Sequence, residues 1–452
     1  MPAPTAAPAR PNAPRGGGWL ALLFGAFVLL TWPVILFGGG GTSEAWDQDE
    51  HHVHVMERFS ASLRGEEGAP PLREALADYP SATSPGFHLA IASLDAAGVR
   101  SRILQRLVAS LAGAATLAVL WMALRRVVDP ITACVMCLPL LASPYMLSGS
   151  IWMTTDVSAL MWSAVAMASV LMRPLTPPWI LAAGFAAALA VFVRQPSIWI
   201  VAPIACAAWS VLQSPRGVVG TSGVSPSRAA IVGSAIVAVL MPCVVLAGLV
   251  SLWGGLVPPV YRAQHAAGFN PALPALALSL LGLWGSPFLI RSRMRPALRV
   301  LAAAVLIGLL ISVIPATDFN KDDGRWGGPI WQVIERTPHV MNRSVIVMFL
   351  ACAGAVFVAG IAAQSTAPGA RGWQVTLGCA ALAIVAALSA NSQAWERYVD
   401  LPLLLLLPLA VASVRGVGAD WTPSEVRLPF LALAAVQITM SAVMVFLPAF
   451  RG

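Results

Sequence analysis

Long apolar runs recur along the whole sequence, and they constrain its fold more than any other feature. A helix needs about 20 apolar residues to cross the roughly 30 Å hydrocarbon core of a bilayer. In lipid, the backbone polar groups of such a segment must be satisfied internally, so the runs predict transmembrane helices. We count about thirteen of them: Trp19–Gly40, Ile103–Leu124, Ile131–Ile151, Val157–Met172, Trp179–Val193, Ile198–Leu212, Ala229–Trp253, Ala272–Ile290, Leu298–Pro315, Ser344–Ala363, Trp373–Ala390, Val399–Val414 and Leu428–Phe446.

The composition supports an all-α polytopic membrane protein. Of the 452 residues, 58% are hydrophobic and only 11% are charged, which is more apolar than a soluble core of this length requires. Residues 1–18 are rich in Pro, Ala and Gly and are expected to form a flexible cytoplasmic tail. Residues 19–452 are then expected to form one transmembrane domain, embedded in membrane lipids.

The distribution of charge predicts the orientation. With the N-terminus placed in the cytoplasm, the inner segments contain 14 of the 28 basic residues but only 3 of the 20 acidic residues. This bias follows the positive-inside rule, so the net charge of +8 is explained by topology and no nucleic-acid partner is expected. The long outer loops are residues 41–102 and 316–343. High Ala and Arg content favours a bacterial inner membrane, with chemistry on the periplasmic, extracellular or luminal side.

The first outer loop begins with an unusual concentration of titratable groups in WDQDEHHVHVMERF, residues 46–59. Neither Pro nor Gly interrupts residues 47–59, so a short helix along the membrane surface is expected. A carboxylate held there, within hydrogen-bond reach of a hydroxyl, can act as a general base. The alternative interpretation is a solvated acidic loop.

A metal site in this segment is a further alternative. Imidazole and carboxylate groups together suit a divalent cation, and the candidate ligands are Asp47, Asp49 and His51. The spacing does not match the i, i+4 pattern of ligands on a helix. We therefore expect no required cofactor.

Arg194 interrupts an apolar stretch, VFVRQPSIWIV, between two predicted spans. A charge there is costly unless it faces a cavity or a partner, and Asp156 at a similar depth is the candidate counter-charge. The alternative is that Arg194 extends to the lipid headgroups. Arg194 and Gln195 together offer a forked cation and an amide, which suit a lipid-linked phosphate.

Five segments, in order along the chain, resemble a known family. They are DEHHVH (49–54), SATSPGFH (81–88), VFVRQPSIWIV (191–201), KDDGRWGGPIW (321–331) and ERYVDLP (396–402). Together they are similar to segments of the dolichyl-phosphate-glucose α-1,2-glucosyltransferases, which belong to the GT-C class of membrane glycosyltransferases. The resemblance implies a GT-C fold with about 13 transmembrane helices and two long outer loops.

The resemblance also implies a reaction. A hexose, with glucose as the expected sugar, would pass with inversion from a polyprenyl-phosphate sugar to a hydroxyl of a lipid-linked or other glycan acceptor. Asp49 is the candidate base, and Glu50 and Asp47 would orient it or the acceptor. The candidate donor-phosphate ligands are Arg194, Gln195, Lys321, Arg325 and Arg397. The candidate substrate contacts are His52, His54, Asp323, Trp326 and Tyr398.

Other functions remain open at this stage. A flippase or transporter of lipid-linked sugars is one alternative, although transporters place charge at mid-membrane and usually contain internal repeats. A GT-C transferase acting on protein, lipid A or arabinan is the second, and a non-catalytic membrane scaffold is the third. The sequence contains no P-loop and no dinucleotide-binding glycine pattern, so a nucleotide-linked donor is not expected.

Overall fold

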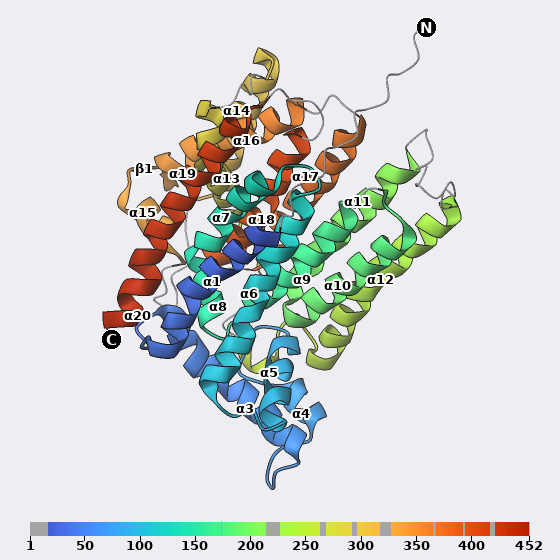
Figure 1. Cartoon of the computed structure of the whole chain (residues 1–452), viewed down its shortest axis with the longest axis vertical. Helices are drawn as coiled ribbons and strands as arrows, with labels where there is room; N and C mark the ends of the chain where they lie inside the picture. Colours follow the sequence, from blue (N-terminus) through green and yellow to red (C-terminus); the bar gives the residue numbers. More distant parts are fainter. Residues whose placement is uncertain are drawn as a thin grey trace.

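The computed structural model of the chain is a bundle of helices (Figure 1). It describes residues 17–451 apart from Arg173 and residues 214–226, 263–267, 292–295, 317–326, 365–367, 392–393 and 416–420. The predicted tail, residues 1–18, lies outside the described residues except for its last two. Two short strands, β1 (His339–Val340) and β2 (Arg343–Ser344), form an antiparallel pair in the second long loop.

The structure contains the following helices, in chain order. They are α1 (Gly17–Phe37), α2 (Ser43–Asp47), η1 (Gln48–His52), α3 (Val53–Arg64), α4 (Leu72–Ala77), α5 (Gly86–Ala96), α6 (Arg102–Leu124), α7 (Pro130–Ala142), α8 (Pro144–Ile151), α9 (Thr155–Val170), α10 (Pro177–Val193), η2 (Gln195–Ile200), α11 (Val201–Leu212), α12 (Arg228–Trp253), η3 (Pro259–Tyr261), α13 (Leu273–Arg291), α14 (Leu298–Val313), α15 (Pro329–Arg336), α16 (Val345–Ala363), α17 (Pro368–Ser389), α18 (Glu396–Arg415), α19 (Pro423–Ser441), η4 (Ala442–Phe446) and α20 (Leu447–Arg451).

Each predicted apolar run coincides with helical structure. Within the described residues, nine helical segments are long and apolar enough to cross a membrane, and α9, α10 and α14 are shorter apolar helices. The run Ile131–Ile151 is not one straight helix, because α7 and α8 meet at a 68° bend. Ser143 at the bend has an extended backbone, as expected for a residue that precedes a proline. Counted as one span, this pair raises the number of spans to ten.

The outer surface of the bundle is apolar. Leu29 on α1, Phe349 on α16 and Leu382 on α17 are all more than 70% exposed, and α12 buries only 17% of its most apolar window. Exposed apolar side chains over whole helices fit a lipid environment rather than water. The protein is therefore an integral, multi-pass membrane protein.

The connections between helices gather at two ends of the bundle. At one end, where α3, α4 and α5 project from it (Figure 1), the backbone of Asn270 before α13 bonds to Ser389 at the end of α17. At the other end, Arg427 of α19 pairs with Asp129 before α7. We call the first end the loop end.

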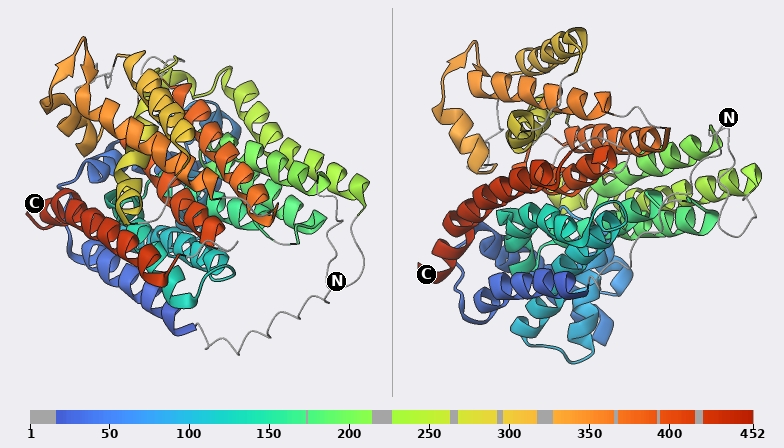
Figure 2. Two further views of the ribbon diagram at one scale, coloured as in Figure 1. Left: turned by 90° about the horizontal axis from the view of Figure 1, so that it is seen from above. Right: turned by 45° about the horizontal axis from the view of Figure 1, so that its top comes forward.

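The last helices return to the loop end beside the first one (Figure 2). The Gly39 N–H, just after α1, donates to the Ala449 carbonyl of α20 over 2.7 Å. A side chain at Gly41 would meet the Pro448 carbonyl, which explains why glycine occupies this crossing.

The predicted surface helix after α1 is part of a longer helical stretch. Thr42 caps α2 by accepting a hydrogen bond from the Ala45 N–H, and Gly65, in the left-handed conformation, ends α3. Between them, η1 is one turn of π-helix. Such a turn carries an extra residue and is frequent at functional sites.

Candidate functional site

Four charged side chains come together at the loop end, although they belong to different parts of the chain. Asp47 ends α2, Asp156 lies in the first turn of α9, Arg194 follows α10 and Arg397 lies in the first turn of α18. Their side chains are only 11–17% exposed. Buried charges of this kind must be paired, and here they form two ion pairs.

The first pair joins the first long loop to α18. Both terminal nitrogens of Arg397 lie 3.1 Å from Asp47 Oδ2. A cation in the first turn of a helix is opposed by the helix dipole, and the Asp47 carboxylate offsets this. The pairing therefore fixes the position of both side chains.

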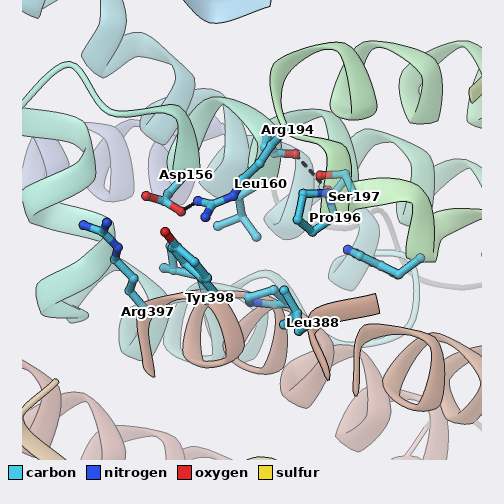
Figure 3. A pocket seen from close by; sticks show the side chains of 13 residues that line it. Asp156, Leu160, Arg194, Pro196, Ser197, Leu388, Arg397 and Tyr398 are labelled. Carbon is cyan, nitrogen blue, oxygen red and sulfur yellow. Dashed lines mark hydrogen bonds and ion pairs between the residues drawn. The ribbon is translucent and has the colours of Figure 1, made fainter. Parts of the chain in front are cut away.

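The second pair joins Arg194 to Asp156, which confirms the predicted counter-charge. Pro196 lacks an N–H and so cannot continue the backbone hydrogen bonds of α10. The helix ends at Val193, and Arg194 after it has an extended backbone. Its guanidinium lies 3.8 Å from the ring centre of Tyr398, and Figure 3 shows the Tyr398 hydroxyl directed toward the Asp156–Arg194 pair.

Three cavities adjoin these side chains. The large cavity has a volume of about 550 Å³ and is lined by Arg194, Gln195 and Arg262 together with apolar residues of η2, α12 and α17. The middle cavity, of about 40 Å³, lies among Asp156, Arg194, Arg397 and Tyr398 (Figure 3). The small cavity, of about 10 Å³, lies beyond it and shares Asp156 and Arg397 with it.

Gln195 holds two loops together at the rim of the large cavity. Its side-chain amide nitrogen donates to the Ala82 carbonyl over 3.0 Å and to the Leu256 carbonyl over 2.9 Å. The segments SATSPGFH and VFVRQPSIWIV are therefore in direct contact. The predicted phosphate ligand Gln195 thus lies beside the cavity and also has a structural role.

Asp49 and Glu50 point elsewhere. Both are exposed, and Asp49 Oδ1 accepts a hydrogen bond from the Gln48 side chain over 2.8 Å. Gln48 in turn accepts from Arg106 of α6. Residues two positions apart on a helix do not face each other, so of Asp47 and Asp49 it is Asp47 that lies in the charged cluster.

The histidines of this segment are divided between two environments. His52 is buried, with its Nδ1 2.8 Å from Nε2 of His88 in α5. Burial, together with the nearby positive charge of Arg397, lowers the pKa of His52 to about 3, and burial also lowers the pKa of His88 well below its usual value. His54 is exposed. Neither predicted contact, His52 or His54, lines any of the three cavities.

The alternative metal ligands are engaged with separate partners. Asp47 pairs with Arg397, Asp49 bonds to Gln48, and the Nδ1 of His51 lies 2.9 Å from the Tyr261 hydroxyl. Among the described residues, no three His, Cys, Asp or Glu side chains are grouped as metal ligands would be.

The predicted residues Lys321, Asp323, Arg325 and Trp326 lie outside the described residues. The part of their loop that the structure describes reaches the cluster at Gly327 and Gly328. The Gly327 carbonyl accepts from the Glu396 N–H, and the Glu396 carboxylate accepts from the Ile330 N–H at the start of α15. Glu396 therefore anchors the second long loop beside Arg397.

Several cavity-lining residues were not among the predicted site residues. They include Glu44, Tyr145, Thr154 and Arg262. Thr154 precedes Asp156 by two residues, and Tyr145 directly follows the Ser143-Pro144 break within an apolar run. A polar residue beside a proline break in a predicted span is the signal that could have identified Tyr145.

Comparison with known proteins gives structural neighbours only. No protein-family model matches the sequence, and no curated protein matches it. The crystal structure of ArnT from Cupriavidus metallidurans bound to undecaprenyl phosphate aligns with a TM-score of 0.40 at 15% identity, over 93% of this chain and 78% of that one. The apo state of the same protein aligns with a TM-score of 0.38 at 13% identity, over 89% and 78% of the two chains.

Proposed function

We propose that this protein is a GT-C membrane glycosyltransferase that takes its sugar from a polyprenyl-phosphate donor. The observation that carries the proposal is the large cavity, where an apolar wall meets the guanidinium groups of Arg194 and Arg262 beside a buried cluster of carboxylates. A lipid phosphate has the same two parts, an apolar tail and an anionic head. Binding sites of this volume commonly combine apolar walls with a few placed polar groups.

The cations of the cluster suit the departing phosphate. A lipid phosphate leaving a sugar carries developing negative charge, which fixed cations stabilise in a site shielded from water. Arg194 and Arg397 are held in place by their carboxylate partners and by the Tyr398 ring. Lys321 and Arg325, which belong to the same long loop as Gly327, are proposed as further phosphate ligands, and Asp323 and Trp326 as substrate contacts.

We assign the role of general base to Asp47. It is the carboxylate of the 47–50 segment that lies in the charged cluster, and a base must be within reach of the hydroxyl that it deprotonates. Asp49, the base expected from the sequence, is the competing candidate, and its exposure leaves it accessible to an acceptor from the aqueous side. A single displacement by the acceptor hydroxyl would invert the anomeric centre.

The proposed identities of the sugar and of the acceptor rest on the resemblance to the dolichyl-phosphate-glucose α-1,2-glucosyltransferases. This resemblance favours a hexose, glucose in particular, as the transferred sugar and a lipid-linked or other glycan as the acceptor. Two of the five resembling segments, at residues 81–88 and 191–201, contact each other through Gln195 and Ala82.

The test uses purified protein with polyprenyl-phosphate-glucose labelled in the sugar and a membrane lipid extract as the source of acceptor. We expect release of polyprenyl phosphate and transfer of label to a product, and neither in the Asp47→Asn variant. A flippase is the second candidate, because the large cavity would also fit a transported lipid phosphate. Movement of intact donor across a bilayer, without release of polyprenyl phosphate, would replace the proposal with the flippase.

A further inference from the structure

The small cavity at the far side of the charged cluster has a polar lining for which the proposed chemistry has no use. Its walls include Glu44, Tyr145, Thr154, Asp156 and Arg397. Its volume of about 10 Å³ is close to the space that one water molecule, and hence one hydroxyl group, occupies. The cavity is therefore of a size to receive a single polar substituent.

Three polar atoms of this lining are buried and lack a hydrogen-bond partner within the part of the chain that the structure describes. They are the hydroxyl oxygens of Tyr145 and Thr154 and the Nε of Arg397, and Thr154 as a whole is only 3% exposed. Buried polar atoms almost always have a partner in folded proteins, because leaving them unpaired is costly. Thr154 is also the N-cap of α9 and makes no capping bond with its side chain.

A glycine keeps this cavity open. A Cβ at Gly149 of α8 would lie 3.2 Å from Thr154 Oγ1 and 2.7 Å from a methyl group of Val157. A larger residue would therefore press on the Thr154 hydroxyl and on the packing between α8 and α9. The neighbouring Tyr145 hydroxyl lies beside the Glu396 carboxylate, which adds a second hydroxyl to the same wall.

The three cavities are arranged in a row. The large and middle cavities share Arg194 and Tyr398, and the middle and small cavities share Asp156 and Arg397. A sugar phosphate whose phosphate lies at Arg194 in the large cavity would extend its ring into the middle cavity. One ring substituent would then enter the small cavity.

We propose that the small cavity binds one hydroxyl group of the transferred sugar and that Thr154 determines specificity for it. This inference rests on the proposed function. A sugar hydroxyl both donates and accepts, so it can accept from Arg397 Nε while it bonds to Thr154. The size of the cavity excludes larger substituents such as an acetamido group.

The experiment compares donors that lack one hydroxyl each. Polyprenyl-phosphate-glucose and its 2-, 3-, 4- and 6-deoxy analogues are tested on wild type, Thr154→Val, Thr154→Ser and Thr116→Val. Thr116 is a buried threonine of α6 whose hydroxyl bonds within its own helix, so it is the matched control. The measured quantity is kcat/KM for each donor.

We expect wild type, Thr154→Ser and Thr116→Val to prefer the full donor over one particular deoxy analogue. In Thr154→Val that preference should fall by about threefold to tenfold, the usual effect of one neutral hydrogen bond, while turnover of the deoxy analogue stays unchanged. An equal loss of kcat/KM on all donors in Thr154→Val, or an unchanged preference for the full donor, would overturn the assignment of Thr154.

A binding measurement separates this inference from the proposed function. Calorimetric titration of the four proteins with methyl β-glucoside, which has the anomeric configuration that an inverting α-glucosyltransferase requires in its donor, needs no turnover. If wild type releases no polyprenyl phosphate but binds the glycoside more tightly than Thr154→Val does, the sugar subsite stands and the transfer reaction is wrong. If it shows neither turnover nor Thr154-dependent binding, both proposals are wrong.

Discussion

Asp47 and Asp49 are separated by one residue but lie in different surroundings. Asp47 faces the bundle and pairs with Arg397, whereas Asp49 is exposed and bonds to Gln48. The sequence places both residues in the same segment but cannot tell which one faces the charged cluster. Only the rotation of the helix, set by its packing against the bundle, separates them.

Replacing each carboxylate in turn decides between them. Removing a general base typically costs about 10²–10⁴-fold in rate, so Asp47→Asn should lose at least about 100-fold in kcat, and Asp49→Asn about tenfold or less. The rates are measured by release of polyprenyl phosphate, with protein amount and folding checked by size-exclusion chromatography. The reverse order of the two variants would restore Asp49 as the base.

The forked shape of the Arg194 side chain is predicted to matter more than its charge. Arg194→Lys keeps the charge but loses the planar fork of N–H groups, of which one nitrogen contacts Asp156, and lysine does not replace arginine where that fork is used. We expect the donor KM to rise about tenfold or more, in line with the loss of a charge-assisted hydrogen bond. Arg427→Lys, at the ion pair with Asp129 on the opposite end, is the control. Equal effects of the two variants would argue against a donor contact by Arg194.

The buried pair His52 and His88 predicts loss of stability in acid. In the folded protein the pKa of His52 is about 3, lowered by burial, and that of His88 is also lowered, whereas in the unfolded chain each titrates near 6.5. The unfolded state therefore binds more protons below pH 6.5. Stability should be fully present above that pH and should fall as the pH decreases from 6.5 toward 3.

Thermal unfolding of the detergent-solubilised protein, followed between pH 7.5 and pH 4, measures this effect. The double variant His52→Gln, His88→Gln should show a smaller decrease of Tm with falling pH than wild type. The exposed His54 provides the control variant His54→Gln, which should behave like wild type. A wild-type Tm that does not change across this range would contradict the prediction.

At the scale of single elements, the π-turn η1 is the feature that determines how the first loop meets the bundle. Its extra residue lets Asp47 face Arg397 while His52, five residues later, packs against His88. The absence of Pro and Gly predicted a helix over residues 47–59, and the structure confirms it. No local pattern predicts the extra residue, because tertiary contacts at both ends of the turn hold it in place.

Removing one residue from this turn should restore a regular α-helix and rotate its two halves by about 100° relative to each other, since an α-helix has 3.6 residues per turn. We expect deletion of Glu50 to reduce polyprenyl phosphate release by more than about 100-fold, because Asp47 or His52 must lose its partner. The deletion should leave the bundle folded, as judged by circular dichroism. Deletion of Glu67, an exposed residue between α3 and α4, is the matched control. Full activity after deletion of Glu50 would show that the register of this turn is unimportant.

Hydropathy did not predict the bend between α7 and α8. The run Ile131–Ile151 is continuous in hydropathy, but Ser143 and Pro144 break it. The bend turns α8 so that Tyr145 and Gly149 reach the small cavity. A proline inside an apolar run, such as Pro287 within α13, does not always break a helix, so the break could not be assigned from the sequence alone.

For the whole molecule, the presence of many long apolar helices was the most predictable property, because it depends only on hydropathy and length. The pairing of Arg194 with Asp156 was also predictable, because a charge at that depth requires a partner. That Glu44, Tyr145 and Thr154 line the same small cavity was not predictable, because their chain segments meet only through tertiary packing. The sequence therefore indicates which loops contain the candidate site residues, but not which of their side chains meet.

The orientation of the bundle is a prediction that labelling can test. The positive-inside rule places the Arg-rich connections in the cytoplasm and the loop end on the far side. In intact cells, a membrane-impermeant maleimide should label Glu67→Cys at the loop end but not Ser424→Cys at the opposite end; both positions are exposed. Permeabilised cells should show labelling at both, and wild type gives the background from native cysteines. Labelling of Ser424→Cys alone in intact cells would invert the topology.

The contact between Gly39 and Ala449 fastens the segment after α1 to the last described helix. Because α1 leaves and α20 arrives at the same end of the bundle, a displacement of α20 would pull on the start of the loop that carries Asp47. A bulkier residue at Gly41, which would meet the Pro448 carbonyl, should therefore disturb the Asp47–Arg397 pair although it lies outside that pair.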